Sequence, residues 1–261
     1  MRVRFPLGAQ GKKKILVDMQ NELETYLEIA QNKVKNPIKR VFILAILAGV
    51  LIALAGAIAT MTSYAIDNVS IKKLVSAAVF PIGLILVIFF QTELFTGNNL
   101  LLIAWKRKKI TIKELLRNWG IVYAGNLIGG FLTALSLYFV WLENSGLREA
   151  MTNTANYKVG LSWWQAIILG FWCNFLVCLA VYFGVTKKTF AEKIGLIFLP
   201  VFAFIALGFE HSVANMFYLS FGGLLAEVSL GQIVVSLAMV TLGNILGGGL
   251  LSLVIDYKSG L

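Results

Sequence analysis

The residues best suited to bind a small solute lie in two short polar stretches of this 261-residue chain. The first runs from Gln91 to Asn99 (QTELFTGNN), and the second runs from Gly208 to Asn215 (GFEHSVAN). The second stretch holds His211, the only histidine of the chain, and imidazole is the side chain that most readily exchanges a proton near neutral pH. These residues indicate hydrogen bonding to a small solute, with proton exchange available at His211.

The rest of the composition indicates that lipid surrounds these stretches. Hydrophobic residues make up 58% of the chain and charged residues 14%, and the mean hydropathy is +0.80. A soluble domain carries about 25% charged residues. Six segments have the roughly 20 mostly apolar residues that a bilayer-spanning helix needs, near residues 41–64, 74–104, 115–142, 161–186, 194–220 and 232–255. We predict an all-α membrane protein with six transmembrane helices, of which the second and fifth are interrupted by Gly and Pro.

Three ionisable residues fall within these predicted spans: Glu93, Glu210 and His211. Removing such groups from water is costly, so each predicts a function. We assign His211 to the solute and the two glutamates to support of the helix breaks, where they can accept backbone N–H groups. Non-helical backbone at membrane depth needs such partners, and the polar side chains available for them are Thr96, Asn98, Asn99, Ser212 and Asn215.

An internal repeat relates the two polar stretches. The motif GNLIGG at residues 125–130 returns as GNILGG at residues 243–248, an offset of 118, and Pro81 and Pro200 are offset by 119. Two sets of three helices therefore follow one another, at about 38–142 and 161–256. Three is odd, so the second set is inverted, and such inverted repeats place a solute site near the bilayer midplane. The glycines themselves also predict close helix packing.

The distribution of the positive residues behind the net charge of +10 indicates a membrane topology. With loops assigned alternately to the two sides, one side holds 19 Lys and Arg residues and the other holds 4. Positive residues mark the cytoplasmic side, so we place both termini in the cytoplasm of a cell with this protein in its inner membrane. The charge also attracts lipid headgroups, and nucleic acid is not an expected partner.

Residues 1–37 form a separate cytoplasmic segment ahead of the channel domain at 38–261. Apolar residues recur there every three or four positions, which predicts an amphipathic helix: Leu16, Met19, Leu23, Leu27, Ala30 and Val34. This segment either anchors the protein at the membrane surface or gates the channel, and the sequence does not distinguish these two roles. It is not a secretory signal, because the first apolar run begins only near Val41.

An enzyme is not expected. Hydrolytic chemistry requires a metal cluster, or a nucleophile with a base, whereas the chain has one histidine and neither an HExxH nor a GxSxG motif. Cys173 and Cys178 share one predicted span and are expected to be buried free thiols. We expect no cofactor and no metal. A scaffold protein would not need broken helices that carry polar residues.

Four stretches resemble the formate/nitrite transporter family, and the match covers residues 35–256. They are Gly83 to Asn98 (GLILVIFFQTELFTGN), Cys173 to Val181 (CNFLVCLAV), Gly208 to Phe217 (GFEHSVANMF) and Gly243 to Leu251 (GNILGGGLL). The resemblance implies an aquaporin-like protomer in a homopentamer, with one pore per protomer. It implies transport of a small monovalent anion or its acid: formate first, with nitrite, hydrosulfide, lactate and acetate open. Water, glycerol or ammonia is the neutral-solute alternative.

The resemblance also implies roles for particular residues. His211 would be the central pore histidine, with Thr96 and Asn174 as its polar neighbours. A cytoplasmic-side constriction would follow from Leu84 and Phe204, with Phe80 close by. Lys158 would attract anions into a vestibule.

Apolar constrictions around a polar centre suit a weak acid. A bare anion loses hydration there at a cost of several kcal/mol or more, whereas its neutral acid avoids most of that cost. Two roles for His211 stay open: it donates a proton transiently, or it stays neutral and only hydrogen-bonds the substrate.

Overall fold

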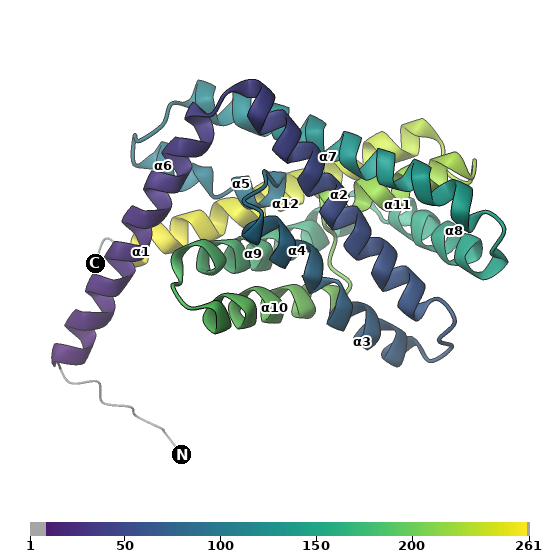
Figure 1. The fold of residues 1–261 in the computed structure, drawn as a ribbon, viewed down its shortest axis with the longest axis horizontal. Helices are drawn as coiled ribbons and strands as arrows, with labels where there is room; N and C mark the ends of the chain where they lie inside the picture. Colours follow the sequence, from purple (N-terminus) through teal and green to yellow (C-terminus); the bar gives the residue numbers. More distant parts are fainter. Residues whose placement is uncertain (1–8, 260–261) are drawn as a thin grey trace, which may run out of the picture.

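The computed structural model describes residues 9–259 and the side chains of residues 17–258, and this part of the chain is helical with short connections (Figure 1). The predicted N-terminal segment and channel domain also include residues 1–8 and 260–261, which lie outside the described residues, as does the side chain of Leu16.

Within residues 9–259, five helical stretches are long and apolar enough to cross a membrane, so this is a multi-pass membrane protein. They are α2 (Ile38–Ser63), α3 with α4 (Val69–Phe89), α7 (Ile112–Trp141), α9 (Trp163–Thr186) and most of α12 (Leu230–Ser259). The fifth predicted span is divided between α10 (Phe190–Ala206) and α11 (Ser212–Leu224). Each of those helices alone is shorter than the roughly 20 residues that a crossing requires.

Local sequence signals explain where several helices begin. The segments before α7, α9 and α10 each carry a capping box, in which a Ser or Thr side chain and a Glu or Gln three residues later satisfy free N–H groups: Thr111 with Glu114, Ser162 with Gln165, and Thr189 with Glu192. Pro81 occupies the first position of α4, where a proline costs no hydrogen bond.

The glycine motifs bring two helix pairs into backbone contact, α2 with α7 and α9 with α12. A Cβ on Gly129 would lie 2.2 Å from the Ile46 carbonyl oxygen, and one on Gly247 would lie 1.9 Å from the Phe171 carbonyl oxygen. No side chain fits at such distances. The prediction of close packing at these glycines is confirmed.

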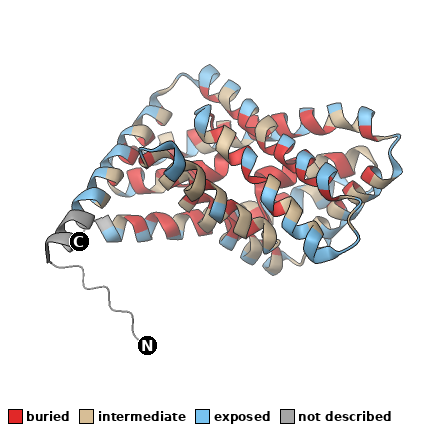
Figure 2. Ribbon diagram, turned by 60° about the horizontal axis from the view of Figure 1, so that its bottom comes forward, coloured by how far each residue is buried: buried red, intermediate tan, exposed pale blue. Residues whose placement is uncertain are grey.

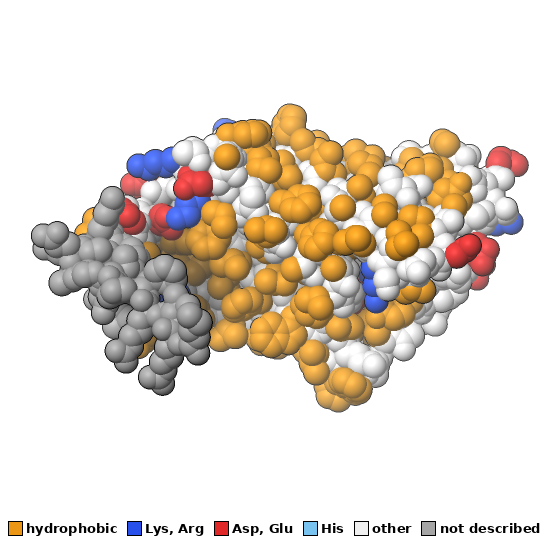
Figure 3. Space-filling model, turned by 90° about the horizontal axis from the view of Figure 1, so that it is seen from below, with side chains coloured by type: hydrophobic (Ala, Val, Ile, Leu, Met, Phe, Trp, Pro, Cys, Tyr) orange, Lys and Arg blue, Asp and Glu red, His pale blue; other side chains and the backbone are white. Residues whose placement is uncertain are grey.

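Buried residues run through the middle of the bundle, and the surface is largely apolar. Figure 2 shows the buried positions along the inner faces of the helices. In Figure 3, apolar side chains cover the middle of one face, while charged side chains lie toward its two ends. This distribution fits a molecule whose waist contacts lipid.

Helix α1 (Ala9–Lys35) is amphipathic as predicted and packs against the bundle. Its apolar face, including Leu23, Tyr26 and Leu27, joins a buried cluster with α6 (Leu101–Lys106), α9 and α12. Glu22 forms an ion pair with Lys187. Helix α8 (Ser145–Gly160) lies at the other end of the molecule (Figure 1).

Candidate functional site

The first helix break separates α4 (Pro81–Phe89) from the short α5 (Phe95–Asn98). The chain turns at Gln91, whose φ of 51° lies in the left-handed region. The Thr92 N–H donates to the Val87 carbonyl at 3.0 Å, and the Glu93 N–H donates to the Leu44 carbonyl at 3.3 Å. Protein groups therefore satisfy the irregular backbone, as its depth requires.

The carboxamide of Asn126 fastens this break to α2. Its Nδ2 donates to the carbonyls of Ala45 (2.7 Å) and Glu93 (2.9 Å). Its Oδ1 accepts from the Phe95 N–H at 2.9 Å. One fully buried side chain thus satisfies three backbone groups from two elements.

The second break, between α10 and α11, repeats this arrangement with Asn244. The Asn244 Nδ2 donates to the carbonyls of Gly170 (2.8 Å) and Glu210 (3.0 Å), and its Oδ1 accepts from the Ser212 N–H at 2.9 Å. The turn residue here is Gly208, with a φ of +70°. The two breaks therefore share these asparagine hydrogen bonds one for one.

Each break also holds one buried glutamate between an asparagine and a lysine. Glu93 accepts from the Asn98 Nδ2 at 2.7 Å and pairs with the Lys33 Nζ at 2.8 Å. Glu210 accepts from the Asn215 Nδ2 at 2.6 Å and pairs with the Lys158 Nζ at 2.8 Å. Lys33 lies on α1 and Lys158 on α8, so these two helices occupy equivalent places at the two breaks.

His211 lies between the two breaks with both ring nitrogens engaged. Its Nδ1 accepts the Ala214 N–H at 3.1 Å, and its Nε2 lies 2.8 Å from the Thr96 Oγ1. Because an accepting Nδ1 carries no proton, the imidazole in this arrangement is neutral and carries its proton on Nε2. The ring therefore donates to Thr96.

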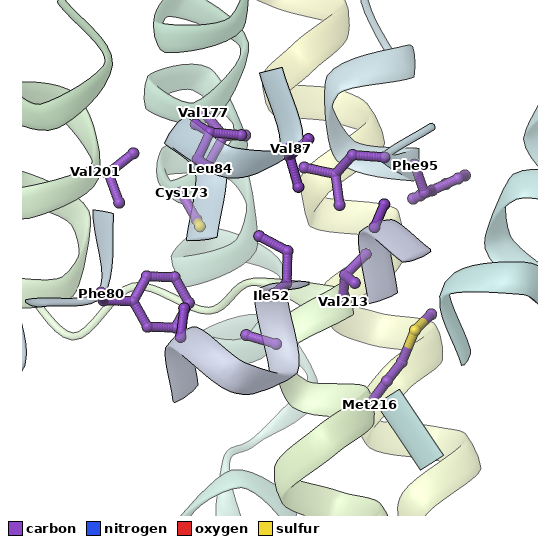
Figure 4. Packing of buried hydrophobic residues seen from close by; sticks show 14 of the residues in the cluster. Ile52, Phe80, Leu84, Val87, Phe95, Cys173, Val177, Val201, Val213 and Met216 are labelled. Atoms are coloured by element: carbon purple, nitrogen blue, oxygen red, sulfur yellow. The ribbon is translucent and has the colours of Figure 1, made fainter. Parts of the chain in front are cut away.

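Aromatic rings cover this histidine. The Phe204 ring stacks on the imidazole with centroids 6.0 Å apart, and the Phe80 ring meets Phe204 edge-on at 6.0 Å. Leu84 belongs to the same apolar cluster (Figure 4). None of these three side chains lines the cavity beside α1. Their role as a cytoplasmic-side constriction stays a prediction.

A cavity of about 700 Å³ opens on the side that carries α1 and reaches the first break. Lys33, Glu93, Leu94 and Asn98 line it, together with residues of α4 and α9. Tyr26 of α1 also lines it, and burial raises the pKa of this hydroxyl well above its ordinary value, so it stays neutral.

Asn174 hydrogen-bonds another amide and a backbone carbonyl, and its role as a polar neighbour of His211 stays a prediction. Its Nδ2 donates to the Asn99 Oδ1 at 2.7 Å and to the Asn244 carbonyl at 2.7 Å. Cys173 and Cys178 are buried free thiols as expected, and the Cys178 Sγ donates to the Thr96 carbonyl at 3.3 Å.

Sequence reasoning did not assign three residues that the structure places at the site. In the sequence, Lys33 is one of several charged residues outside the apolar face of the predicted N-terminal helix. Asn126 and Asn244 were only members of the glycine motifs. The repeat could have identified the two asparagines. Close helix packing explains the glycines of the motif but not a polar residue that occurs in both copies.

Fold and site together define an α-helical multi-pass membrane transport protein, with a polar centre held between two equivalent helix breaks. The sequence profile described as Formate/nitrite transporter matches residues 20–258. The chain belongs to the formate/nitrite transporter family, which confirms the predicted resemblance. It is a family of channels and transporters, so the chain is not an enzyme.

Named relatives agree with this assignment. The chain is 35% identical over 234 residues to "Formate channel FocA" of Haemophilus influenzae, covering 80% of this chain and 82% of that protein. A solved structure described as "FNT family ion channel" superposes with a TM-score of 0.81 at 28% identity, over 91% of this chain and 98% of that one. The "Pentameric formate channel with formate bound" gives a TM-score of 0.72 at 32% identity, over 82% and 93%.

Proposed function

We propose that this chain is a channel for small monovalent anions or their conjugate acids, with formate as the main substrate. The observation that carries this proposal is the His211–Thr96 hydrogen bond of 2.8 Å beneath the Phe204 ring. One neutral polar pair enclosed by apolar groups provides a resting point for a small weak acid. A bare anion would lose its hydration there without replacement.

The proposed architecture has six spans in an inverted 3+3 repeat, aquaporin-like, with the second and fifth spans interrupted. The two matching sets of hydrogen bonds around Asn126 and Asn244 support it. In this architecture the channel domain spans residues 38–261 and its two repeats span about 38–142 and 161–256. Helix α1 precedes the first repeat and α8 precedes the second. By analogy with the pentameric formate channel, the chain would form a homopentamer with one pore per protomer.

The two lysines would collect anions at the two ends of the pore. Lys158 is paired with Glu210 and its side chain is 10% exposed; Lys33 is paired with Glu93 and is 22% exposed, on the wall of the cavity beside α1. A partly exposed lysine can donate a charged N–H to an arriving anion. Its own buried charge is compensated by the paired glutamate. We place both termini in the cytoplasm and the protein in the inner membrane, with lipid around its waist.

His211 has two candidate roles in this scheme, which are transient proton donation and neutral hydrogen bonding. The bond from the Ala214 N–H to Nδ1 supports the neutral role, because protonating Nδ1 would break it. Glu93, Asn98, Glu210 and Asn215 support the breaks, and Phe80, Leu84 and Phe204 narrow the path.

Uptake by purified protein in liposomes tests the function. Formate, nitrite, lactate and hydrosulfide are compared at two external pH values, with empty liposomes as the control. Formate uptake that rises as the external pH falls is the expected result. Uptake of nitrite or hydrosulfide alone would show that one of these anions, and not formate, is the main substrate. Passage of water or glycerol without any anion would overturn the proposal.

A second comparison separates the roles of His211. His211→Phe keeps an aromatic ring but offers neither donor nor acceptor, and Thr62→Ala on the exposed face of α2 is the matched control. Formate uptake in His211→Phe that remains coupled to protons and undiminished would exclude the donor role.

A further inference from the structure

The cavity beside α1 is larger and more positive than passage of formate requires. Its volume of about 700 Å³ lies in the range of sites that hold drug-sized ligands, roughly 300–1,000 Å³. Lys33, Arg40 and Lys193 line it, and among the described residues on its wall Glu93 is the only carboxylate. Three positive charges against one negative charge leave the cavity with a net charge of +2.

Two of these three cations are available to a ligand. The charge of Lys33 is already matched by Glu93, 2.8 Å away. Arg40 is exposed and Lys193 is half-buried, and within residues 17–258 neither side chain has a carboxylate partner. The cavity therefore presents two unmatched positive charges, which an occupant with two negative charges would neutralise.

The two available cations belong to different helices. Arg40 lies near the start of α2 and Lys193 near the start of α10, and α4 packs against both helices. A ligand that reaches both cations must therefore extend past the end of α4. Phe89 and Phe90 at that end are exposed and line the cavity, and aromatic rings offer apolar surface to the body of such a ligand.

The cavity ends before the central site. Leu94 and Gly97 of the first break line its inner end, whereas neither Thr96 nor His211 lines it. Leu94 is buried, and a Cβ on Gly97 would lie 3.2 Å from the Val181 Cγ2, so the packing there leaves little room. Two negative charges would also lose their hydration beyond this point. A large dianion that enters the cavity would therefore stop there.

We propose that this cavity binds an organic dianion, in which two carboxylate or phosphate groups flank an apolar body, and that the bound dianion blocks transport from the side that carries α1. One anionic group pairs with Arg40 and the other with Lys193, while the body contacts Phe89 and Phe90. Arginine suits such a group because its guanidinium donates two parallel N–H groups to it. The block rests on the proposed function, whereas the binding does not.

Isothermal titration calorimetry of the purified, detergent-solubilised protein tests the binding. The probes are the three isomers of benzenedicarboxylate, and benzoate is the control with one charge on the same ring. We expect at least one isomer to bind about tenfold more tightly than benzoate, and to bind more weakly as salt rises. Arg40→Gln and Lys193→Gln should each weaken that binding about tenfold, the effect of one charged hydrogen bond. Lys39→Gln and Lys188→Gln, exposed and outside the cavity, should match wild type.

Absence of binding by all three isomers would overturn the inference. Benzoate binding as tight as that of the dianions would overturn it too, as would dianion binding that either Arg40→Gln or Lys193→Gln leaves unchanged.

Formate uptake into liposomes of defined orientation tests the block. On the α1 side, the tightest dianion at about ten times its half-saturating concentration should lower the initial rate about tenfold, because few protomers stay unoccupied. The same dianion on the opposite side should leave the rate unchanged. In Arg40→Gln/Lys193→Gln the inhibition should disappear, with each protein compared with its own uninhibited rate. Equal inhibition from both sides, or no inhibition by a dianion that binds, would overturn the block. Wild-type protein without formate uptake would instead overturn the proposed function, whatever the titration shows.

Discussion

Lys33 and Lys158 occupy equivalent positions at the two helix breaks. Each Nζ lies 2.8 Å from the Oε2 of a buried glutamate, and each glutamate also accepts from an asparagine of the helix that follows the break. The glutamate therefore holds the break and the lysine together. Neither lysine is a free surface charge.

Removing either lysine should slow anion entry from its own side. Lys33→Met or Lys158→Met leaves a buried carboxylate without its counter-charge, which repels anions and costs stability. We expect at least about a tenfold loss of formate uptake in each, with Lys158→Met the less stable variant because its pair is more buried. Uptake into liposomes of defined orientation measures the sidedness, and exposed Lys39→Met is the control. A loss without sidedness would count against the entry role.

The asparagines that fasten the breaks should matter equally for stability. Asn126→Ala or Asn244→Ala removes three hydrogen bonds to buried backbone groups. We expect each change to lower the free energy of unfolding by about 3 kcal/mol. Denaturant titration of the detergent-solubilised protein measures this, with Thr62→Ala as the control. A large effect at one asparagine and none at the other would contradict the equivalence of the breaks.

Two glycines with opposite surroundings give a sharp packing test. Gly247→Ala would place a Cβ 1.9 Å from the Phe171 carbonyl oxygen, so α9 and α12 must separate and folded protein should be lost. Gly120→Ala on α7 meets no atom within 4 Å and should stabilise its helix by up to about 1 kcal/mol. Size-exclusion yield and thermal unfolding of both variants report the outcome. Normal assembly of Gly247→Ala would contradict the close contact.

The two turn residues predict opposite stability changes. Gln91 and Gly208 hold equivalent positions with positive φ, but only one is glycine. Gln91→Gly should stabilise and Gly208→Ala should destabilise, each by about 1 kcal/mol, because L side chains disfavour this conformation. Gly208 has no atom near its Cβ direction, so crowding does not confuse the measurement. Thermal unfolding of the two variants measures these stability changes. Changes of the same sign in both variants would contradict the conformational argument.

The sequence predicted the helical class and the apolar spans, because length and hydropathy are local signals; the role of His211 stays a prediction. It predicted polar stretches that begin at Gln91 and Gly208, within the irregular backbone, and extend into the helices that follow. Asn98 and Asn215 belong to the helices after the breaks, while the irregular backbone lies at residues 90–94 and 207–211. Positive φ at Gln91 has no strong local signature, since glutamine is not a turn residue.

Contacts between distant segments were beyond a single sequence. The ion pair from Lys33 to Glu93 joins positions separated by a whole span, and nothing in the apolar stripe of α1 marks Lys33. The hydrogen bond of Asn174 with Asn99 depends on how α9 meets the first break. Such pairings are set by tertiary packing.

The equivalence of α1 and α8 has an evolutionary consequence. If the proposed inverted repeat arose by duplication, the duplicated unit was one helix plus three spans, and α1 and α8 descend from the same ancestral helix. Two unfused copies of such a unit, inserted in opposite directions, would have built the same pore as a dimer. In that topology fusion would fix the directions of both halves together, and the imbalance of 19 to 4 basic residues between the two sides would record it.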